Sequence, residues 1–241
     1  MKSSRTRTVL ALAAVAAVAL LITTVSANAD TVNVNFDFTV FDRTDLVGPA
    51  GGAGETWNQT MLGGHNVAGG FSGVDVLDSA GVATGIDWSL KRSDDGGLFR
   101  WVGSEEATLS MLDHGIFTNS KLTHTLTITE LDPAKTYDLY ITGYGGSFGN
   151  KTTSTAVNTT TTSNPQVMLQ TGETANWVLN DNYILFEDMV PNGSGTLAVD
   201  AVKNSSYGFW SGFQVQEVPE PASMVLLAMG GLALLRRRRR A

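Results

Sequence analysis

The chain has 241 residues, no cysteine and a formal net charge of −7 at pH 7. The absence of cysteine excludes a disulfide framework, thiolate zinc sites, iron–sulfur clusters and a thiol nucleophile. Half of the basic residues lie near the two ends, so residues 30–217 hold only eight basic residues against 22 acidic ones. That part of the chain carries about −14 and repels phosphate backbones, so we expect no nucleic-acid partner.

Residues 1–29 have the three parts of a secretory signal peptide. A positively charged segment comes first, formed by Lys2, Arg5 and Arg7. The 14 residues 9–22 are all apolar, and Ala27 and Ala29 then give the small-residue pattern that signal peptidase cleaves, with Asp30 as the first mature residue. The alternative is an uncleaved anchor helix. Fourteen residues span only about 21 Å, against a hydrocarbon core of roughly 30 Å, so we expect cleavage.

Residues 30–217 are expected to fold as one all-β domain, since this length can bury a substantial core. The first strand alternates strictly, with apolar side chains on one face at Val32, Val34, Phe36, Phe38 and Val40. Alternation recurs over 86–90, 122–128 and 137–142, and in the last of these Asp138, Tyr140 and Thr142 take the polar face. Further strands are expected at 166–170, 183–186, 196–199 and 209–215.

The domain shows no stretch of 12 or more residues with convincing helical spacing of apolar side chains. Many short strands with Gly- and Asn-rich turns and no helical crossovers predict an antiparallel β-sandwich. A low-complexity segment at 152–164, in which nine of 13 residues are Thr or Ser, is interpreted as a solvated loop or an edge strand. The alternative is a Thr-rich face that is glycosylated or binds polysaccharide.

Residues 218–241 form a second segment with a distinct layout. It opens with Val218, Pro219, Glu220, Pro221, Ala222 and Ser223. An apolar stretch at 224–235 follows, and the segment closes with Arg236, Arg237, Arg238, Arg239 and Arg240. The prolines hold an extended conformation, the apolar stretch forms a short transmembrane helix, and the arginines keep that end on the cytoplasmic side. A permanent tail anchor is the alternative.

This segment resembles the PEP-CTERM sorting signal, because the Pro-Glu-Pro motif, short apolar helix and arginine run occur in that order at the C-terminus. The resemblance implies a Gram-negative-type bacterium and an exosortase-type enzyme that removes the tail; signal peptidase is the second partner, expected from residues 1–29. It also implies a transient anchor in the inner membrane. Delivery to the cell envelope, the surface or the extracellular matrix follows, and no catalytic residue is implied in this chain.

The domain 30–217 loosely resembles exported jelly-roll modules of the galactose-binding-like and carbohydrate-binding kind. The pieces that carry this resemblance are Leu131-Asp132-Pro133, which leads into 137–140, and the closing segment 212–215. The resemblance implies a jelly-roll sandwich and carbohydrate binding.

Catalytic and metal chemistry find little support in the sequence. His65, His114 and His124 lack zinc-ligand spacing, and the parity of His124 with its apolar neighbours predicts a packed, hydrogen-bonded histidine. We expect no catalytic residue and no cofactor. A structural calcium ion is a weaker hypothesis, for which the candidate ligands are Asp37, Asp42 and Asp45.

Aromatic residues beside Gly-, Asn- and Asp-rich loops are the candidate glycan-binding residues, because a flat ring can lie against the apolar face of a sugar. The set is Trp57, Trp101 and Trp177, with amide partners at Asn58 and Asn182. Trp88 and Trp210 are expected in the core. Three hypotheses remain: an exported envelope protein that grips polysaccharide, a secreted glycosidase or lyase on the same fold, and a purely structural or adhesive surface protein.

Overall fold

The computed structural model describes residues 33–39, 46, 48–50, 55–61, 66–67, 69–94, 98–102, 112, 114–118, 122–143, 152–157, 165–171, 175–204 and 208–219. The predicted signal peptide with Ala27, Ala29 and Asp30 lies outside the described residues, as does the sorting segment from Glu220 onwards. Residues Val32–Val218 form a compact unit. In the described part of the chain, no helix is long and apolar enough to cross a membrane.

Every regular element in the described residues is a β-strand, which confirms the all-β prediction. The first sheet has the order β12 (Tyr183–Met189), β9 (Tyr137–Thr142), β15 (Gly212–Glu217), β1 (Asn33–Thr39) and β2 (Asn58–Met61). The second has the order β11 (Gln166–Met168), β10 (Thr152–Val157), β13 (Leu197–Lys203), β8 (His124–Thr129), β5 (Asp87–Arg92) and β4 (Phe71–Gly73). The third has the order β14 (Gly208–Trp210), β7 (His114–Thr118), β6 (Leu98–Val102) and β3 (Asn66–Val67).

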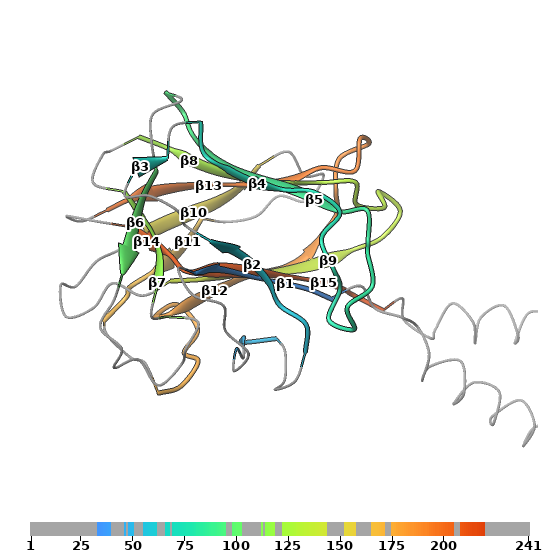
Figure 1. Ribbon diagram of the computed structural model, residues 1–241, viewed down its shortest axis with the longest axis horizontal. Helices are drawn as coiled ribbons and strands as arrows, with labels where there is room; N and C mark the ends of the chain where they lie inside the picture. Colours follow the sequence, from blue (N-terminus) through green and yellow to red (C-terminus); the bar gives the residue numbers. More distant parts are fainter. Residues whose placement is uncertain are drawn as a thin grey trace, which may run out of the picture. The chain divides into compact units, whose positions relative to one another are not determined.

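The first two sheets form the layers of a β-sandwich, and the third lies at one end of them (Figure 1). The alternation seen in the sequence explains why the layers pack, because each strand places its apolar side chains on the inner face of its sheet. Phe36 and Phe213 of the first sheet stack at 5.1 Å between ring centroids, and Trp88 of the second meets Phe36 edge-on at 4.3 Å. The expectation that Trp88 and Trp210 are core residues is confirmed, because both are buried.

Two details of the topology differ from the prediction. The pairing of β1 with β2 is parallel, whereas the other strand pairs are antiparallel, so the chain crosses between these two strands instead of turning back as a hairpin. The Thr-rich segment begins with β10, which lies between β11 and β13, so residues 152–154 are paired on both sides and are not the solvated loop or edge strand expected there. Thr152 and Ser154 are buried there, and residues 158–164 lie outside the described residues.

Candidate functional site

The outer face of the first sheet carries a group of half-buried aromatic side chains. In β9, Leu139 and Ile141 are fully buried on the inner face, so Tyr140 points to the outer face. In β12, buried Ile184 likewise leaves Tyr183 on the outer face, where Tyr183 is in register with Thr142. Tyr140 and Tyr183 are therefore diagonal neighbours on adjacent strands, with ring centroids 6.3 Å apart.

Trp177 extends this group beyond the edge strand β12. Its ring meets Tyr183 edge-on, with centroids 6.2 Å apart and an interplanar angle of 83°. Trp177, Tyr183 and Tyr140 are each half-buried, so part of every ring remains exposed to a ligand. We call these three residues the aromatic face.

Asn182 fixes the turn that carries Trp177. Its side-chain Oδ1 accepts a hydrogen bond from the backbone N–H of Val178 at 2.9 Å, and its Nδ2 donates to the carbonyl of Asn176 at 2.7 Å. The side chain is buried, so it is a positioning residue rather than the ligand contact predicted from the sequence. Because the turn is held from within the protein, the Trp177 side chain would lose little conformational freedom on contact with a ligand.

Two carboxylates lie near Tyr140 in the aromatic face. Burial raises the pKa of Tyr140, and the nearby Asp138, Tyr183 and Glu187 raise it further. These neighbours show that two acidic side chains lie close to the Tyr140 hydroxyl, which stays protonated at neutral pH. The face therefore presents aromatic rings, a hydroxyl donor and negative charge, a combination that suits a neutral polyhydroxyl ligand and repels an acidic one.

Trp57 lies farther along the same outer face. A Cβ added at Gly48 would collide with both the Gln214 carboxamide and the Trp57 ring, so these three residues converge. Gln214 is in register with Tyr140 across β15 and β9, which places Trp57 beside the outer face of β15. The structure thus brings two of the three predicted tryptophans, Trp57 and Trp177, to the same sheet.

A buried amide network holds the segment that covers the other half of this face. Gln214 accepts a hydrogen bond from the N–H of Ala50 at 2.9 Å and donates to Asn35 Oδ1 at 2.7 Å. Asn35 in turn donates to Glu55 at 2.9 Å. Asn58 donates to the carbonyl of Leu77 at 2.7 Å and accepts from the same residue's N–H at 2.9 Å. The predicted ligand partner Asn58 is therefore committed to the fold.

The remaining predicted site residues lie elsewhere. Trp101 belongs to β6 in the third sheet, and its side chain is outside the described residues. Asp37 is buried on β1, whereas Asp42 and Asp45 lie outside the described residues. Among the residues that the structure describes, no group of three or more His, Asp or Glu could hold a metal ion. The calcium hypothesis stays a prediction.

His124 is buried at the start of β8, as its parity predicted. Burial, followed by the positive charge of Arg92, lowers the pKa of His124 to about 4, although Asp94 and a hydrogen bond to the Leu122 backbone oppose the shift. The imidazole is therefore neutral at pH 7 and forms part of the packed interior.

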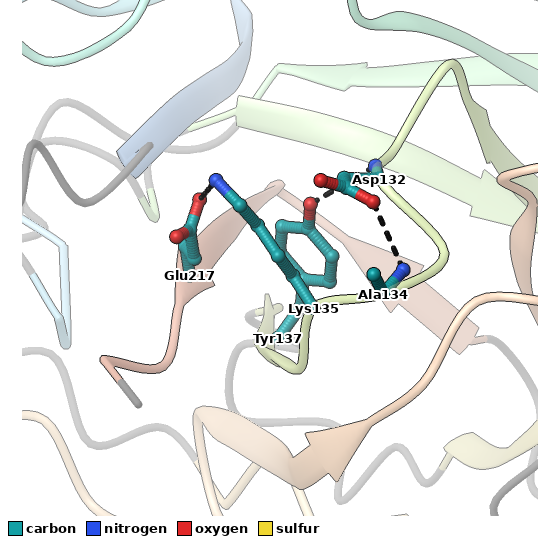
Figure 2. A network of polar contacts seen from close by, with 5 residues as sticks. All are labelled: Asp132, Ala134, Lys135, Tyr137 and Glu217. Carbon is teal, nitrogen blue, oxygen red and sulfur yellow. Dashed lines mark hydrogen bonds and ion pairs between the residues drawn. The ribbon is translucent and has the colours of Figure 1, made fainter. Parts of the chain in front are cut away.

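The C-terminal end of the domain is fastened to the turn between β8 and β9 (Figure 2). Asp132 Oδ1 accepts a hydrogen bond from the N–H of Ala134 at 2.9 Å, and the Tyr137 hydroxyl accepts one from the N–H of Asp132 at 3.1 Å. Lys135 Nζ forms an ion pair with Glu217 at 2.8 Å, and the Glu217 carboxylate raises the pKa of Lys135. The charged Lys135 therefore holds Glu217, the last residue of β15, through an ion pair.

Sequence reasoning missed Tyr140 and Tyr183 as site residues. The available signal was the parity of Tyr140, which shares the polar face with Asp138 and Thr142. That parity places the ring on the outer face, but the pairing of β9 with β12 that brings Tyr183 beside it requires the tertiary structure. A half-buried tyrosine pair next to a turn tryptophan is visible only in three dimensions.

The fold and the outer face define an all-β protein whose last strand runs directly into a C-terminal segment. Residues 217–240 match the PEP-CTERM protein-sorting motif, which confirms the resemblance seen in the sequence. The motif implies an exported, envelope-associated protein processed by an exosortase-type enzyme. No curated protein matches the sequence.

Three solved structures are partly similar to the chain. TmCBM61 in complex with beta-1,4-galactotriose is 11% identical, with a TM-score of 0.35 over 54% of this chain and 88% of that one. The tailspike protein 4 enzymatically active domain of bacteriophage CBA120 is 15% identical, with a TM-score of 0.26 over 54% of this chain and 18% of that one. The exo-beta-1,3-galactanase of Phanerochaete chrysosporium with galactose is 12% identical, with a TM-score of 0.26 over 60% of this chain and 36% of that one. This chain therefore spans less than half of the last two proteins, and function is argued below from its own residues.

Proposed function

We propose that this protein is an exported, exosortase-sorted surface or matrix protein that binds neutral extracellular polysaccharide through its aromatic face. It acts as a binding protein and not as an enzyme. The sorting motif supports delivery to the envelope, and the aromatic face supports the choice of ligand. The observation that carries the binding proposal is the cluster of Tyr140, Tyr183 and Trp177, which stays half-exposed on the outer side of a sheet whose inner side is core.

The geometry of the cluster suits a polymer. From β12 to β15 the face spans two strand spacings, roughly 10 Å, with Trp177 beyond one edge and Trp57 beside the other. That length exceeds one hexose ring, so adjacent units of a chain can contact successive aromatic side chains. Rings fixed by the fold contribute apolar contact at low entropic cost, and hydroxyl and carboxylate groups beside them accept or donate hydrogen bonds to the sugar.

The charge of the face selects among polysaccharides. Asp138 and Glu187 lie close to Tyr140, and the domain as a whole is strongly acidic. A polymer rich in uronate or sulfate would be repelled, and the repulsion would grow as ionic strength falls. We therefore assign the site to a neutral hexose polymer rather than to an acidic one.

The test is isothermal titration of the mature protein, purified from its host, with a panel of neutral and acidic polysaccharides. Trp177→Ala and Tyr140→Ala should each weaken binding of a neutral polymer about tenfold, because truncating an aromatic residue at the centre of an interface costs on the order of 1–2 kcal/mol. Val74→Ala is the control, since this side chain is exposed beside β4 in the second sheet.

Three outcomes would contradict the proposal. Equal affinities of the wild type and the two aromatic variants would remove the aromatic face from binding. Release of reducing sugar would instead indicate a glycosidase or lyase. Self-association without binding to any polymer would favour a purely structural or adhesive protein.

A further inference from the structure

The sorting segment and the folded domain overlap in sequence. The motif match begins at residue 217, whereas β15 ends at Glu217. Val218, the next residue, donates its backbone N–H to the carbonyl of Thr136 at 2.9 Å. The first two residues of the matched segment are therefore held by the domain, and Pro219 is the first exposed residue after them.

Two contacts at this point form what we call the tail clamp. One is the ion pair between Lys135 Nζ and Glu217 at 2.8 Å, and the other is the hydrogen bond between Val218 and Thr136. Glu217 keeps only 14% of its side chain exposed, whereas Lys135 keeps 40% and reaches across from the turn after β8 (Figure 2). The clamp is thus built by residues far away in the chain.

The clamp exists only when the domain is folded. β15 lies in the middle of the first sheet, hydrogen-bonded to β9 on one side and to β1 on the other. Its side chains Phe213 and Val215 are buried in the core, so the strand cannot take its place before its neighbours are in position. Glu217 and Val218 are therefore held in this conformation only in the folded domain.

We propose that Lys135 is a positioning residue for tail removal, which holds the root of the sorting segment extended for the exosortase-type processing enzyme. This inference rests on the sorting part of the proposed function and not on polysaccharide binding. β15 ends in extended conformation, and the residue before a proline is biased towards extended backbone, so the clamp and Pro219 direct the chain the same way. A peptide held in its bound conformation loses less entropy when an enzyme engages it.

The clamp also limits how far the Pro-Glu-Pro motif can lie from the domain. From Val218 to Ala222 there are four residues, which can span at most about 14 Å when fully extended. The length of chain therefore keeps the Pro-Glu-Pro motif within about 14 Å of Val218. A processing enzyme that engages this motif must approach the turn that carries Lys135.

The experiment follows tail removal by pulse-chase in the host, with one epitope in the domain and one in the tail. Lys135→Gln should lengthen the half-time of tail loss at least threefold, and Lys135→Arg, which keeps the ion pair, should restore it. Lys91→Gln on β5 removes an exposed charge from the second sheet and should leave the half-time unchanged. Inserting Gly-Ser after Val218 keeps the clamp but moves the motif about 7 Å away, and should also slow tail loss.

Thermal melts of each variant show whether slower tail loss comes from a less stable domain or from a sorting segment that is no longer held in place. A slower tail loss in the insertion variant, with an unchanged melt, supports positioning. Unchanged or faster tail loss in both Lys135→Gln and the insertion variant would overturn the clamp while leaving sorting intact. A wild-type protein that keeps its tail epitope at the cell surface would contradict the sorting proposal itself, and the clamp with it.

Discussion

His124 shows how one side chain couples this fold to pH. The histidine is 6% exposed, and its neutral form is favoured by burial and by Arg92. Its partner across the strand pair is Arg92 itself, and Asp94 follows two residues later. Protonation would place a second positive charge beside that arginine inside the sandwich.

We predict that acid destabilises the protein through this residue. The pKa of His124 is about 4 in the folded state and 6.5 in the unfolded state, so the unfolded state binds the extra proton as the pH falls from 6.5. The loss grows down to pH 4 and amounts to about 3 kcal/mol. Urea unfolding of wild type and His124→Leu at pH 7, 5.5 and 4 measures it as the difference between their pH slopes. Parallel slopes would show that His124 does not contribute.

The sequence predicted burial well and the roles of two amide side chains poorly. Alternation placed His124, Leu139 and Ile141 inside correctly, because one strand suffices to define parity. It chose Trp177 for the site but assigned ligand contact to Asn58 and Asn182, whose amides satisfy backbone groups instead. Whether an amide serves the fold or a ligand depends on neighbours that single-strand patterns do not specify.

The elements explain how the outer face of the first sheet is divided. On β9 and β12 the face stays open enough to leave aromatic rings half-exposed. On β15 and β1 it is covered, because Gln214 and Asn35 bind the segment that contains Ala50 and Glu55. The parallel pairing of β1 with β2 requires a long crossover, and this covering segment is part of it.

We predict that Gln214→Ala lowers the free energy of unfolding by about 2–3 kcal/mol, because it leaves the buried Asn35 Oδ1 and the partly buried Ala50 N–H without these partners. Gln216→Ala, two residues along the same face of β15 and only half-buried, should cost under 1 kcal/mol. Urea denaturation of both variants gives the comparison. Equal costs would mean that the amide network does not hold the covering segment in place.

Strand positions were predictable because alternation is local, and the order of strands was not. Composition predicts an exposed segment at the Thr-rich β10, yet this strand lies between β11 and β13 in the second sheet. Threonine is a good strand former. On β13, buried Ala201 and Val199 lie opposite Ser154 and Ala156 and supply the apolar packing that the segment lacks. Composition cannot reveal a partner strand 40 residues away.

In the molecule as a whole, the predicted signal peptide and the sorting motif both indicate export to the cell envelope. A signal peptide at 1–29 stays a prediction, whereas the PEP-CTERM match at 217–240 is a finding. On the proposed function, export and tail removal are followed by retention through polysaccharide binding.

On the proposed function, the aromatic face keeps the mature protein at the surface after the tail is removed. The direct measurement is fractionation of host cultures into cells, polysaccharide matrix and medium, blotted for the domain and tail epitopes. We predict that wild type is in the matrix without its tail epitope, and that the double variant Tyr140→Ala, Trp177→Ala loses the tail normally but is in the medium. A double variant retained in the matrix as fully as wild type would contradict the account.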